Sequence, residues 1–287
     1  QGFEKLYPPQ ADSVKSGLLI GKSILVSAPT ASGKTLIAML AMISYISKNK
    51  GKVIYLSPLR ALAAEKFSEF KKLEKISLGN KIKVAISTGD FENIEKNLEK
   101  SNVLILTNEK MDSIIRHSAE WVDEIGLVIS DEVHLIGDEN RGPTLEMILT
   151  QLKLLDTKPQ IVGLSATITN SDEVADWLGC KLVKNDWRPV PLSEGVCEGG
   201  EVIMSDGKTF EVERSLRGTP IDLGVQSVQQ GGQSLVFAET RARSKSLATK
   251  ASDVISLMLE KKEKTELEKT SKKILSENEH TELVKTL

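Results

Sequence analysis

The sequence predicts an α/β protein built on a doubly wound parallel sheet. Short runs rich in β-branched and aliphatic residues recur along the first two thirds of the 287 residues. Each run ends in a polar loop that leads into a segment with helical spacing. Most runs are apolar throughout instead of alternating with polar residues, which is typical of parallel strands covered on both faces. This alternation of strand and helix favours a parallel sheet with helices on both sides.

Six runs are the expected strands, and helical segments separate them. These strands are residues 23–27, 53–57, 82–87, 103–107, 127–130 and 161–165. The first expected helix runs from about residue 34 to residue 47, and apolar residues recur at helical intervals in residues 62–73 and 111–115. Because ligands of such sheets bind at the carboxyl ends of the strands, chemistry is expected in the loops after these strands.

A domain boundary is expected near residue 185, which divides the chain into residues 1–185 and 186–287. Residues 187–192 read Trp-Arg-Pro-Val-Pro-Leu, and the two prolines disfavour helix on either side of this extended segment. The linker between two domains is therefore expected there.

The part beyond this linker shows the same kinds of local pattern. Residues 202–204 and 209–212 flank an Asp-Gly pair, which predicts a hairpin. Residues 234–237 (Ser-Leu-Val-Phe) indicate a buried strand, and a helix with one apolar face is expected after it, as far as Met258. Charges of both signs alternate in residues 260–285, as on a solvated helix. A second α/β domain is therefore expected to begin here.

Composition and charge exclude several classes of protein. Hydrophobic residues (40%) and charged residues (27%) are near the averages of globular proteins, so a disordered, collagen-like or coiled-coil chain is not expected. No apolar run is long enough to cross a bilayer, and the first residues lack the pattern of a targeting peptide, so we expect a cytoplasmic protein without a membrane partner. Cys180 and Cys197 form no metal-ligand pattern. A net charge of -2 means that any binding of nucleic acid must use local contacts.

The segment after the first strand has the pattern of a phosphate-binding loop. It matches GxxxxGK[ST] with alanine in place of the first glycine. In such loops backbone N–H groups and a helix N-terminus surround the phosphates of a nucleotide. Here Gly33 is expected to let the backbone approach the phosphates closely, Lys34 to reach the terminal phosphates, and Thr35 to ligate Mg²⁺. An ordinary turn is the alternative. The predicted nucleotide-binding residues of the loop are Ala28, Pro29, Thr30, Ala31, Ser32, Gly33, Lys34 and Thr35.

A phosphate loop needs an acidic partner at the end of another strand, and the run at residues 127–130 is followed by one. Asp131 is expected to hold Mg²⁺ through water, and Glu132 to orient or deprotonate the water that attacks the terminal phosphate. Asp131 and Glu132 are therefore the predicted catalytic residues. A solvated acidic pair at the end of a strand is the alternative.

Several of these segments resemble the motifs of superfamily II helicases, in the order of that family. Residues 131–134 (Asp-Glu-Val-His) resemble the DExH box, and residues 7–10 (Tyr-Pro-Pro-Gln) resemble the Q motif. Residues 58–62 resemble motif Ia, residues 107–110 resemble motif Ib, and residues 165–167 (Ser-Ala-Thr) match motif III. Motif III alone is a weak tripeptide, whereas five motifs in order are a strong signal.

Further residues narrow the resemblance to one branch. Residues 187–192, together with Arg-Gly-Pro at residues 141–143, are similar to the Ski-type branch, most closely to the archaeal Hjm-type ATP-dependent DNA helicases. The resemblance covers essentially the whole chain. It implies a RecA-like P-loop NTPase domain followed by the incomplete start of a second RecA-like domain. It also implies ATP and Mg²⁺ as cofactors, and Gln10 as the residue that reads adenine.

No segment of the sequence resembles the family's motifs V and VI. In these helicases those motifs lie in the second domain and contribute nucleic-acid contacts and arginine fingers. Winged-helix and ratchet domains are not found either. The resemblance therefore implies an N-terminal fragment without the C-terminal motor and accessory domains, and we expect such a fragment to hydrolyse ATP slowly or not at all.

Loops at the same edge of the sheet are predicted to contact a nucleic-acid strand. Arg60 and the Thr107 hydroxyl lie at the starts of expected helices and suit phosphate oxygens, and Pro58 belongs to the same segment as Arg60. Arg60 would equally suit a surface salt bridge, and Thr107 a helix cap.

Three more residues are predicted to couple the nucleotide side to the strand side. His134 and the hydroxyls of Ser165 and Thr167 could form a hydrogen-bonded link between them. A simple packed histidine is the alternative for His134.

The function implied by the resemblance is that of an ATP-dependent DNA helicase motor that tracks single-stranded DNA three-prime to five-prime and acts in DNA repair at stalled forks. Single-stranded or forked DNA is the expected partner. An RNA helicase of the same branch is the alternative, because contacts to the phosphate backbone do not distinguish RNA from DNA unless a 2′-OH is read. A P-loop switch or kinase that controls a protein partner, and a nucleic-acid clamp without turnover, also stay open. Residues 108–112 do not have the Asn-Lys-x-Asp spacing of a GTPase.

Overall fold

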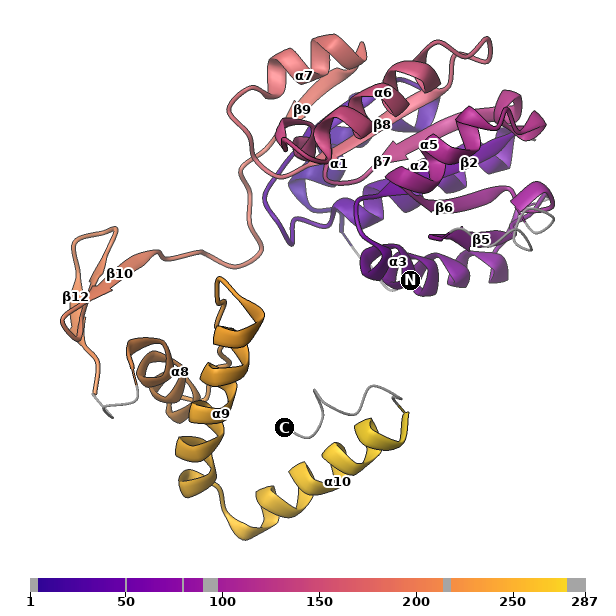
Figure 1. Ribbon diagram of the computed structural model, residues 1–287. Helices are drawn as coiled ribbons and strands as arrows, with labels where there is room; N and C mark the ends of the chain where they lie inside the picture. Colours follow the sequence, from indigo (N-terminus) through magenta and orange to yellow (C-terminus); the bar gives the residue numbers. More distant parts are fainter. Residues whose placement is uncertain (1–4, 50, 79, 90–97, 214–217, 278–287) are drawn as a thin grey trace. The chain divides into compact units, whose positions relative to one another are not determined.

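The chain divides into two compact units, Gln1–Pro191 and Leu192–Leu287 (Figure 1). The computed structural model describes residues 5–49, 51–78, 80–89, 98–213 and 218–277. The division falls after Pro191, six residues beyond the predicted boundary at residue 185, and the Trp187 ring contacts the Tyr7 ring of the first unit. None of the helices in the described ranges has the length and apolar character needed to span a membrane.

A seven-stranded parallel sheet forms the centre of the first unit. Its strand order is β5-β6-β2-β7-β8-β1-β9, and every neighbouring pair is parallel. The strands are β1 (Ile24–Ser27), β2 (Lys52–Ser57), β5 (Val84–Ser87), β6 (Val103–Thr107), β7 (Ile125–Ser130), β8 (Gln160–Ser165) and β9 (Lys181–Lys184). Six of them coincide with the predicted strands, which confirms the predicted fold class. Prediction misses the edge strand β9, because Val183 is its one buried residue and lysines stand at both its ends.

Helices cover both faces of this sheet (Figure 1). Helices α2 and α3 pack on one face, whereas α5, α6 and α7 pack on the other. In the described ranges, the α-helices of this unit are α1 (Pro8–Lys15), α2 (Lys34–Lys48), α3 (Arg60–Phe70), α5 (Asn108–Arg116), α6 (Gly142–Lys153) and α7 (Ser171–Leu178). Short 3-10 helices are η1 (Leu18–Ile20), η2 (Lys71–Lys75), η4 (Glu120–Glu124) and η5 (Val133–Gly137). The short strand β3 (Ser77–Leu78) pairs antiparallel with β4 (Asn80–Lys81).

The sheet has a hydrophobic core on each face, and successive residues of each strand belong alternately to one core and the other. Ile24 and Val26 of β1 belong to the core under α2 and α3, whereas Leu25 belongs to the core under α5, α6 and α7. All three are completely buried. Burying one such side chain contributes about 1.5–3 kcal/mol, so both faces of the strand favour apolar residues. The interior positions of the strands are therefore mostly apolar instead of alternating with polar residues, as the sequence indicates.

The carboxyl ends of the strands form a polar edge. Six strands end in serine or threonine, and all six of these residues are buried: Ser27, Ser57, Ser87, Thr107, Ser130 and Ser165. Parallel pairing brings these ends to the same edge of the sheet, since the strands all run in one direction. The loops that carry the predicted site residues start from this edge.

The second unit begins with a three-stranded antiparallel sheet. Its strands are β10 (Gly195–Glu198), β11 (Glu201–Met204) and β12 (Thr209–Glu211). Strands β11 and β12 form the predicted hairpin, in which Gly207 has a left-handed backbone (φ 84°) and Lys208 N–H donates to Asp206 Oδ1 over 3.1 Å. Residues 218–277 then form the helices α8 (Thr219–Gln229), α9 (Arg241–Met258) and α10 (Lys261–Glu277).

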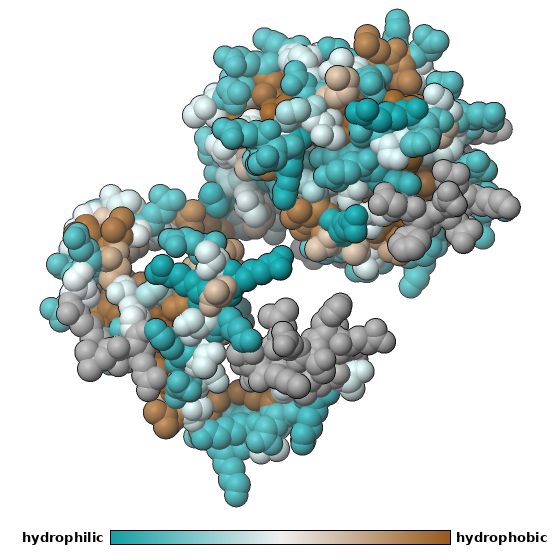
Figure 2. All heavy atoms as spheres, viewed as in Figure 1, coloured by the Kyte–Doolittle hydropathy of each residue, from teal (hydrophilic) through white to brown (hydrophobic). Residues whose placement is uncertain are grey.

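The predicted buried strand at residues 234–237 is wrong. This segment is not a strand, and the side chains of Leu235 and Phe237 are 79% and 86% exposed. Hydrophobic residues are visible on the surface of the second unit (Figure 2). A strand is stable only beside a hydrogen-bonded neighbour, and the described residues after Gly218 contain no other strand that could pair with it. That this unit begins a second RecA-like domain stays a prediction.

Candidate active site

The predicted phosphate loop connects β1 to α2 in a conformation suited to binding an anion. Ala31 and Gly33 have left-handed backbones, with φ of 66° and 84°. A left-handed residue beside right-handed ones turns successive N–H groups to the same side, which forms a concave anion site. A Cβ at Gly33 would collide with the Gln10 amide, so only glycine fits at the start of α2.

Two side chains of the loop are placed to meet a phosphate group. The Ser32 hydroxyl is buried and has no hydrogen-bond partner among the described residues. Lys34 Nζ donates to the backbone oxygens of Ala28 (2.8 Å) and Pro29 (3.1 Å). Burial lowers the pKa of Lys34 from its ordinary value, and the carboxylate of Glu132 partly opposes this effect. The loop therefore holds an ammonium and an unpartnered hydroxyl beside its N–H groups, which fits a nucleotide's phosphates.

The Asp131 carboxylate is fixed in orientation at the end of β7. The buried Tyr55 hydroxyl of β2 donates to Asp131 Oδ2 over 2.6 Å, and Glu132 N–H donates to Asp131 Oδ1 over 3.0 Å. Burial, followed by the nearby Asp131 charge, raises the pKa of Tyr55 well above its ordinary value, so Tyr55 remains a donor. Nothing in the sequence around Tyr55 identifies it as a partner of Asp131.

Glu132 adopts a left-handed backbone (φ 52°, ψ 46°), which is unusual for a residue with a side chain. Such conformations cost about 1–3 kcal/mol and occur preferentially at functional sites, where the surrounding structure enforces them. The Glu132 carboxylate lies 3.4 Å from His134 Nδ1. Asp131 and Glu132 therefore project from one tight turn beside the phosphate loop.

His134 connects this turn to the loop after β8. Ala166 N–H donates to His134 Nδ1 over 3.3 Å. Ser165, by contrast, donates its hydroxyl to the Ala166 oxygen over 2.8 Å, and Thr167 is exposed. The contact between the two loops therefore runs through the backbone of residue 166 and not through the two hydroxyls that the sequence suggests.

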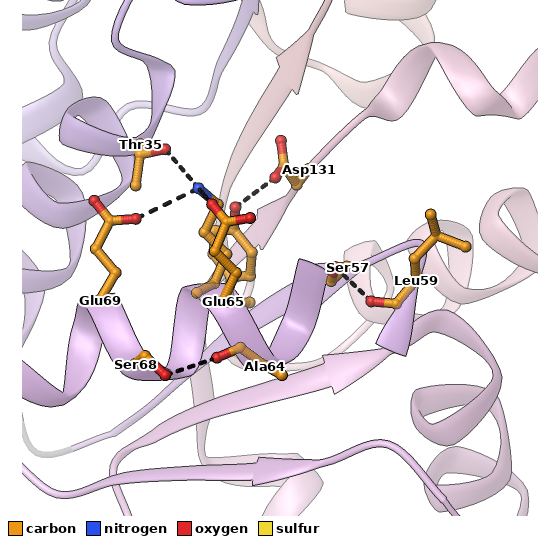
Figure 3. A network of polar contacts seen from close by, with 10 residues as sticks. Thr35, Ser57, Leu59, Ala64, Glu65, Ser68, Glu69 and Asp131 are labelled. Atoms are coloured by element: carbon orange, nitrogen blue, oxygen red, sulfur yellow. Dashed lines mark hydrogen bonds and ion pairs between the residues drawn. The ribbon is translucent and has the colours of Figure 1, made fainter. Parts of the chain in front are cut away.

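The predicted magnesium ligands offer the hard oxygen atoms that Mg²⁺ prefers. They are the Thr35 hydroxyl at the start of α2 and the Asp131 carboxylate at the end of β7. The Thr35 hydroxyl accepts a hydrogen bond of 3.0 Å from Lys66 Nζ of α3, so this oxygen already faces a positive charge (Figure 3). The described residues contain no group of three or more His, Cys, Asp or Glu that could hold a metal. In nucleotide sites Mg²⁺ commonly takes one or two protein ligands besides phosphate oxygens and water.

Gln10 lies against the phosphate loop. It is 4% exposed; its Oε1 accepts from Tyr7 N–H over 2.8 Å, and its Nε2 donates to the Gly33 oxygen over 3.2 Å. The rings of Tyr7 and Trp187 lie 4.6 Å apart between centroids. Trp187, which the sequence places in the linker segment, therefore belongs to the surroundings of Gln10.

A second polar region lies at the same edge, after β2, β5 and β6. It is a hollow of about 330 Å³ in which the three predicted nucleic-acid residues, Pro58, Arg60 and Thr107, come together. Arg60 forms no ion pair with a described residue, whereas Thr107 caps α5 by accepting from Lys110 N–H over 3.3 Å. Further side chains around the hollow are Glu109, Lys110 and Arg141, which lie in predicted motifs without a predicted contact, and Thr88, which sequence reasoning misses.

Two relatives of this chain are named ATP-dependent DNA helicase Hel308. The chain is 42% identical over 285 residues to the ATP-dependent DNA helicase Hel308 of Thermococcus kodakarensis, covering 99% of this chain and 24% of that protein. It is also 42% identical over 287 residues to the Hel308 of Pyrococcus horikoshii, covering 100% of this chain and 38% of that protein. The chain thus spans between 24% and 38% of the length of these two relatives.

Solved helicase structures share the fold. The helicase MrfA bound to DNA superposes with a TM-score of 0.70 at 23% identity, covering 94% of this chain and 41% of that chain. The Mycobacterium smegmatis helicase Lhr bound to ssDNA and AMP-PNP superposes with a TM-score of 0.56 at 31% identity, covering 65% of this chain and 26% of that chain. The first unit therefore has the RecA-like fold of a helicase domain.

The family model described as DEAD/DEAH box helicase matches residues 7–174. This match begins at the segment that carries Gln10 and includes the phosphate loop, the Asp131–Glu132 turn and the hollow. Because the model covers more than half of the residues, the chain belongs to the DEAD/DEAH box helicase family.

Proposed function

We propose that the first unit is the ATP-binding motor domain of an ATP-dependent DNA helicase. One observation carries the proposal: a single sheet edge holds a phosphate loop, an acidic turn beside it, and a hollow with an arginine that pairs with no described residue. The similarity to proteins named ATP-dependent DNA helicase supports the same conclusion. We infer that the chain is an N-terminal part of such a protein and includes the start of its second motor domain.

The acidic turn, the phosphate loop and Gln10 have different roles in ATP binding and hydrolysis. Lys34 and the loop N–H groups bind the terminal phosphates, and Gln10 reads the adenine. Thr35 and Asp131 hold Mg²⁺, which when bound neutralises charge on the phosphates. Glu132 accepts a hydrogen bond from the attacking water and takes its proton.

The hollow holds the backbone of single-stranded or forked DNA through Arg60, Thr107 and Pro58. His134 passes the state of the nucleotide to the loop after β8 through the backbone N–H of Ala166, and Ser165 and Thr167 flank this contact. We further propose tracking from three-prime to five-prime, a role in DNA repair, and a cytoplasmic location. These follow from the resemblance to the Hjm-type helicases.

ATP turnover measured without nucleic acid, with single-stranded DNA and with single-stranded RNA tests this function. We expect this chain to turn over ATP slowly, and a version extended through the second motor domain to be strongly stimulated by DNA. An arginine finger from that domain is worth on the order of a thousandfold in rate. Stronger stimulation by RNA would favour an RNA helicase. ATP binding without any stimulation in the extended version would contradict the helicase function and favour a nucleotide switch or clamp.

A further inference from the structure

Lys66 is the basic side chain that contacts the proposed magnesium ligand Thr35. It lies on α3, and its side chain is only 13% exposed. Its ammonium donates to Thr35 Oγ1 over 3.0 Å, whereas Glu65 and Glu69 of the same helix lie farther away, at 3.4 Å each. Figure 3 shows Thr35, Glu65 and Glu69 converging on this one nitrogen atom. The closest polar contact of the ammonium is therefore the neutral hydroxyl, although two carboxylates are within reach.

This contact has a direct consequence for a metal at the same hydroxyl. A Mg²⁺ ion binds oxygen at about 2.1 Å, so Mg²⁺ and the Lys66 nitrogen on one hydroxyl oxygen would be at most about 5 Å apart. Two cations at that distance, away from bulk water, repel each other strongly. The two carboxylates offer the ammonium another position after a small movement. Glu69, which is 35% exposed, holds a charge at this site better than Glu65, which is 64% exposed.

We propose that Lys66 competes with Mg²⁺ for the Thr35 hydroxyl and withdraws to Glu69 when Mg²⁺ binds with the nucleotide. This inference rests on the proposed nucleotide site. Lys66 is a positioning residue in it: it sets the Mg²⁺ concentration at which the nucleotide is held, and it touches no reacting atom.

Nucleotide binding without turnover tests this competition. The fluorescence of mant-ADP is followed while Mg²⁺ is added to the full chain, and the midpoint of the Mg²⁺ dependence is compared among variants. Lys66→Met should lower the midpoint about tenfold, which is the effect of losing one charge-assisted hydrogen bond. Glu69→Gln removes the alternative position of the ammonium and should shift the midpoint to higher Mg²⁺. Lys71→Met is the matched control, since Lys71 pairs with Glu74 at 2.8 Å and lies on η2, outside the site.

The outcomes separate this inference from the proposed function. A wild-type chain that binds no mant-ADP would contradict the nucleotide site itself. Mg²⁺-dependent binding by the wild type, with an unchanged or higher midpoint in Lys66→Met, would overturn the competition alone. Thermal unfolding shows whether each variant is folded. If Lys66→Met fails to fold, Glu69→Gln decides the matter, because an unchanged or lower midpoint there contradicts the proposal.

Discussion

The two polar regions at the carboxyl edge of the first unit hold their charged side chains in different ways. Around the phosphate loop, three of the groups proposed to bind nucleotide and metal already have protein partners: Lys34 donates to loop oxygens, Thr35 accepts from Lys66, and Asp131 accepts from Tyr55. In the hollow, Arg60 is exposed and pairs with no described carboxylate. One region is organised by its own hydrogen bonds, whereas the other presents charge to solvent.

This difference predicts that substitutions in the two regions affect ligand binding in different ways. Preorganised donors and acceptors lose little conformational freedom on binding, so single substitutions there should have large effects. Exposed cations bind phosphates through salt-dependent contacts, so each substitution in the hollow should have a smaller effect that high salt removes. Four substitutions test whether the two regions separate in this way.

The largest effect is expected for Glu132→Gln. Glutamine cannot take the proton of the attacking water, so ATP turnover should fall by about 10²–10⁴-fold while ATP affinity is retained. The measurement is single-turnover hydrolysis in a chain extended through the second motor domain, with ATP binding measured in parallel. Equal turnover by the variant would remove Glu132 from catalysis.

Lys34→Ala should lower ATP affinity by roughly a hundredfold, because two charge-assisted hydrogen bonds to phosphate are lost. The fold should be retained, since the side chain contributes little to the core. Titration calorimetry with ATP measures the effect, and thermal unfolding checks the fold. Lys48→Ala is the control: Lys48 lies at the other end of α2 and contacts the Leu19 oxygen. A folded Lys34→Ala variant with wild-type affinity would contradict the phosphate-loop assignment.

Arg60→Ala should weaken binding of single-stranded DNA roughly tenfold at low salt. The slope of log affinity against log salt concentration should fall by the amount expected for about one phosphate contact. ATP affinity should be unchanged. Fluorescence anisotropy of a labelled oligonucleotide at several salt concentrations measures both quantities. Arg116→Ala is the matched control, because Arg116 is exposed at the end of α5 and already paired with Asp112 at 2.8 Å. If both variants weaken binding equally, the hollow has no special role.

The smallest effect is expected for Thr107→Ala. Loss of the α5 cap should lower the free energy of unfolding by about 1 kcal/mol, and Thr107→Ser should restore most of it. Urea denaturation measures the change. Weaker DNA binding by folded Thr107→Ala, with binding by Thr107→Ser intact, would give the hydroxyl a role in the hollow beyond the cap. Unchanged stability would show that the cap is unimportant.

The local pattern of apolar residues predicts the strands of the first unit, because each strand contributes side chains to the hydrophobic cores on both faces of the sheet. The continuous burial of β2 and β6 is visible as continuous apolar runs. The phosphate loop and the Asp131–Glu132 pair are also predictable, because phosphate and Mg²⁺ chemistry requires particular residue types at short spacing. The sequence alone therefore determined the fold class and the centre of the candidate site.

Only the tertiary structure decided which distant residues support that centre. No local motif pairs Tyr55, Lys66 or Trp187 with Asp131, Thr35 or Tyr7; they meet because parallel pairing and helix packing bring separate elements together. The segment at residues 234–237 shows the converse, since its pattern suits a strand but its side chains are largely exposed. The same physical reason explains the supporting residues that the sequence does not reveal and the strand that it wrongly predicts. Hydrogen-bond partners and strand neighbours are supplied by other parts of the chain, so neither can be inferred from the spacing of nearby residues.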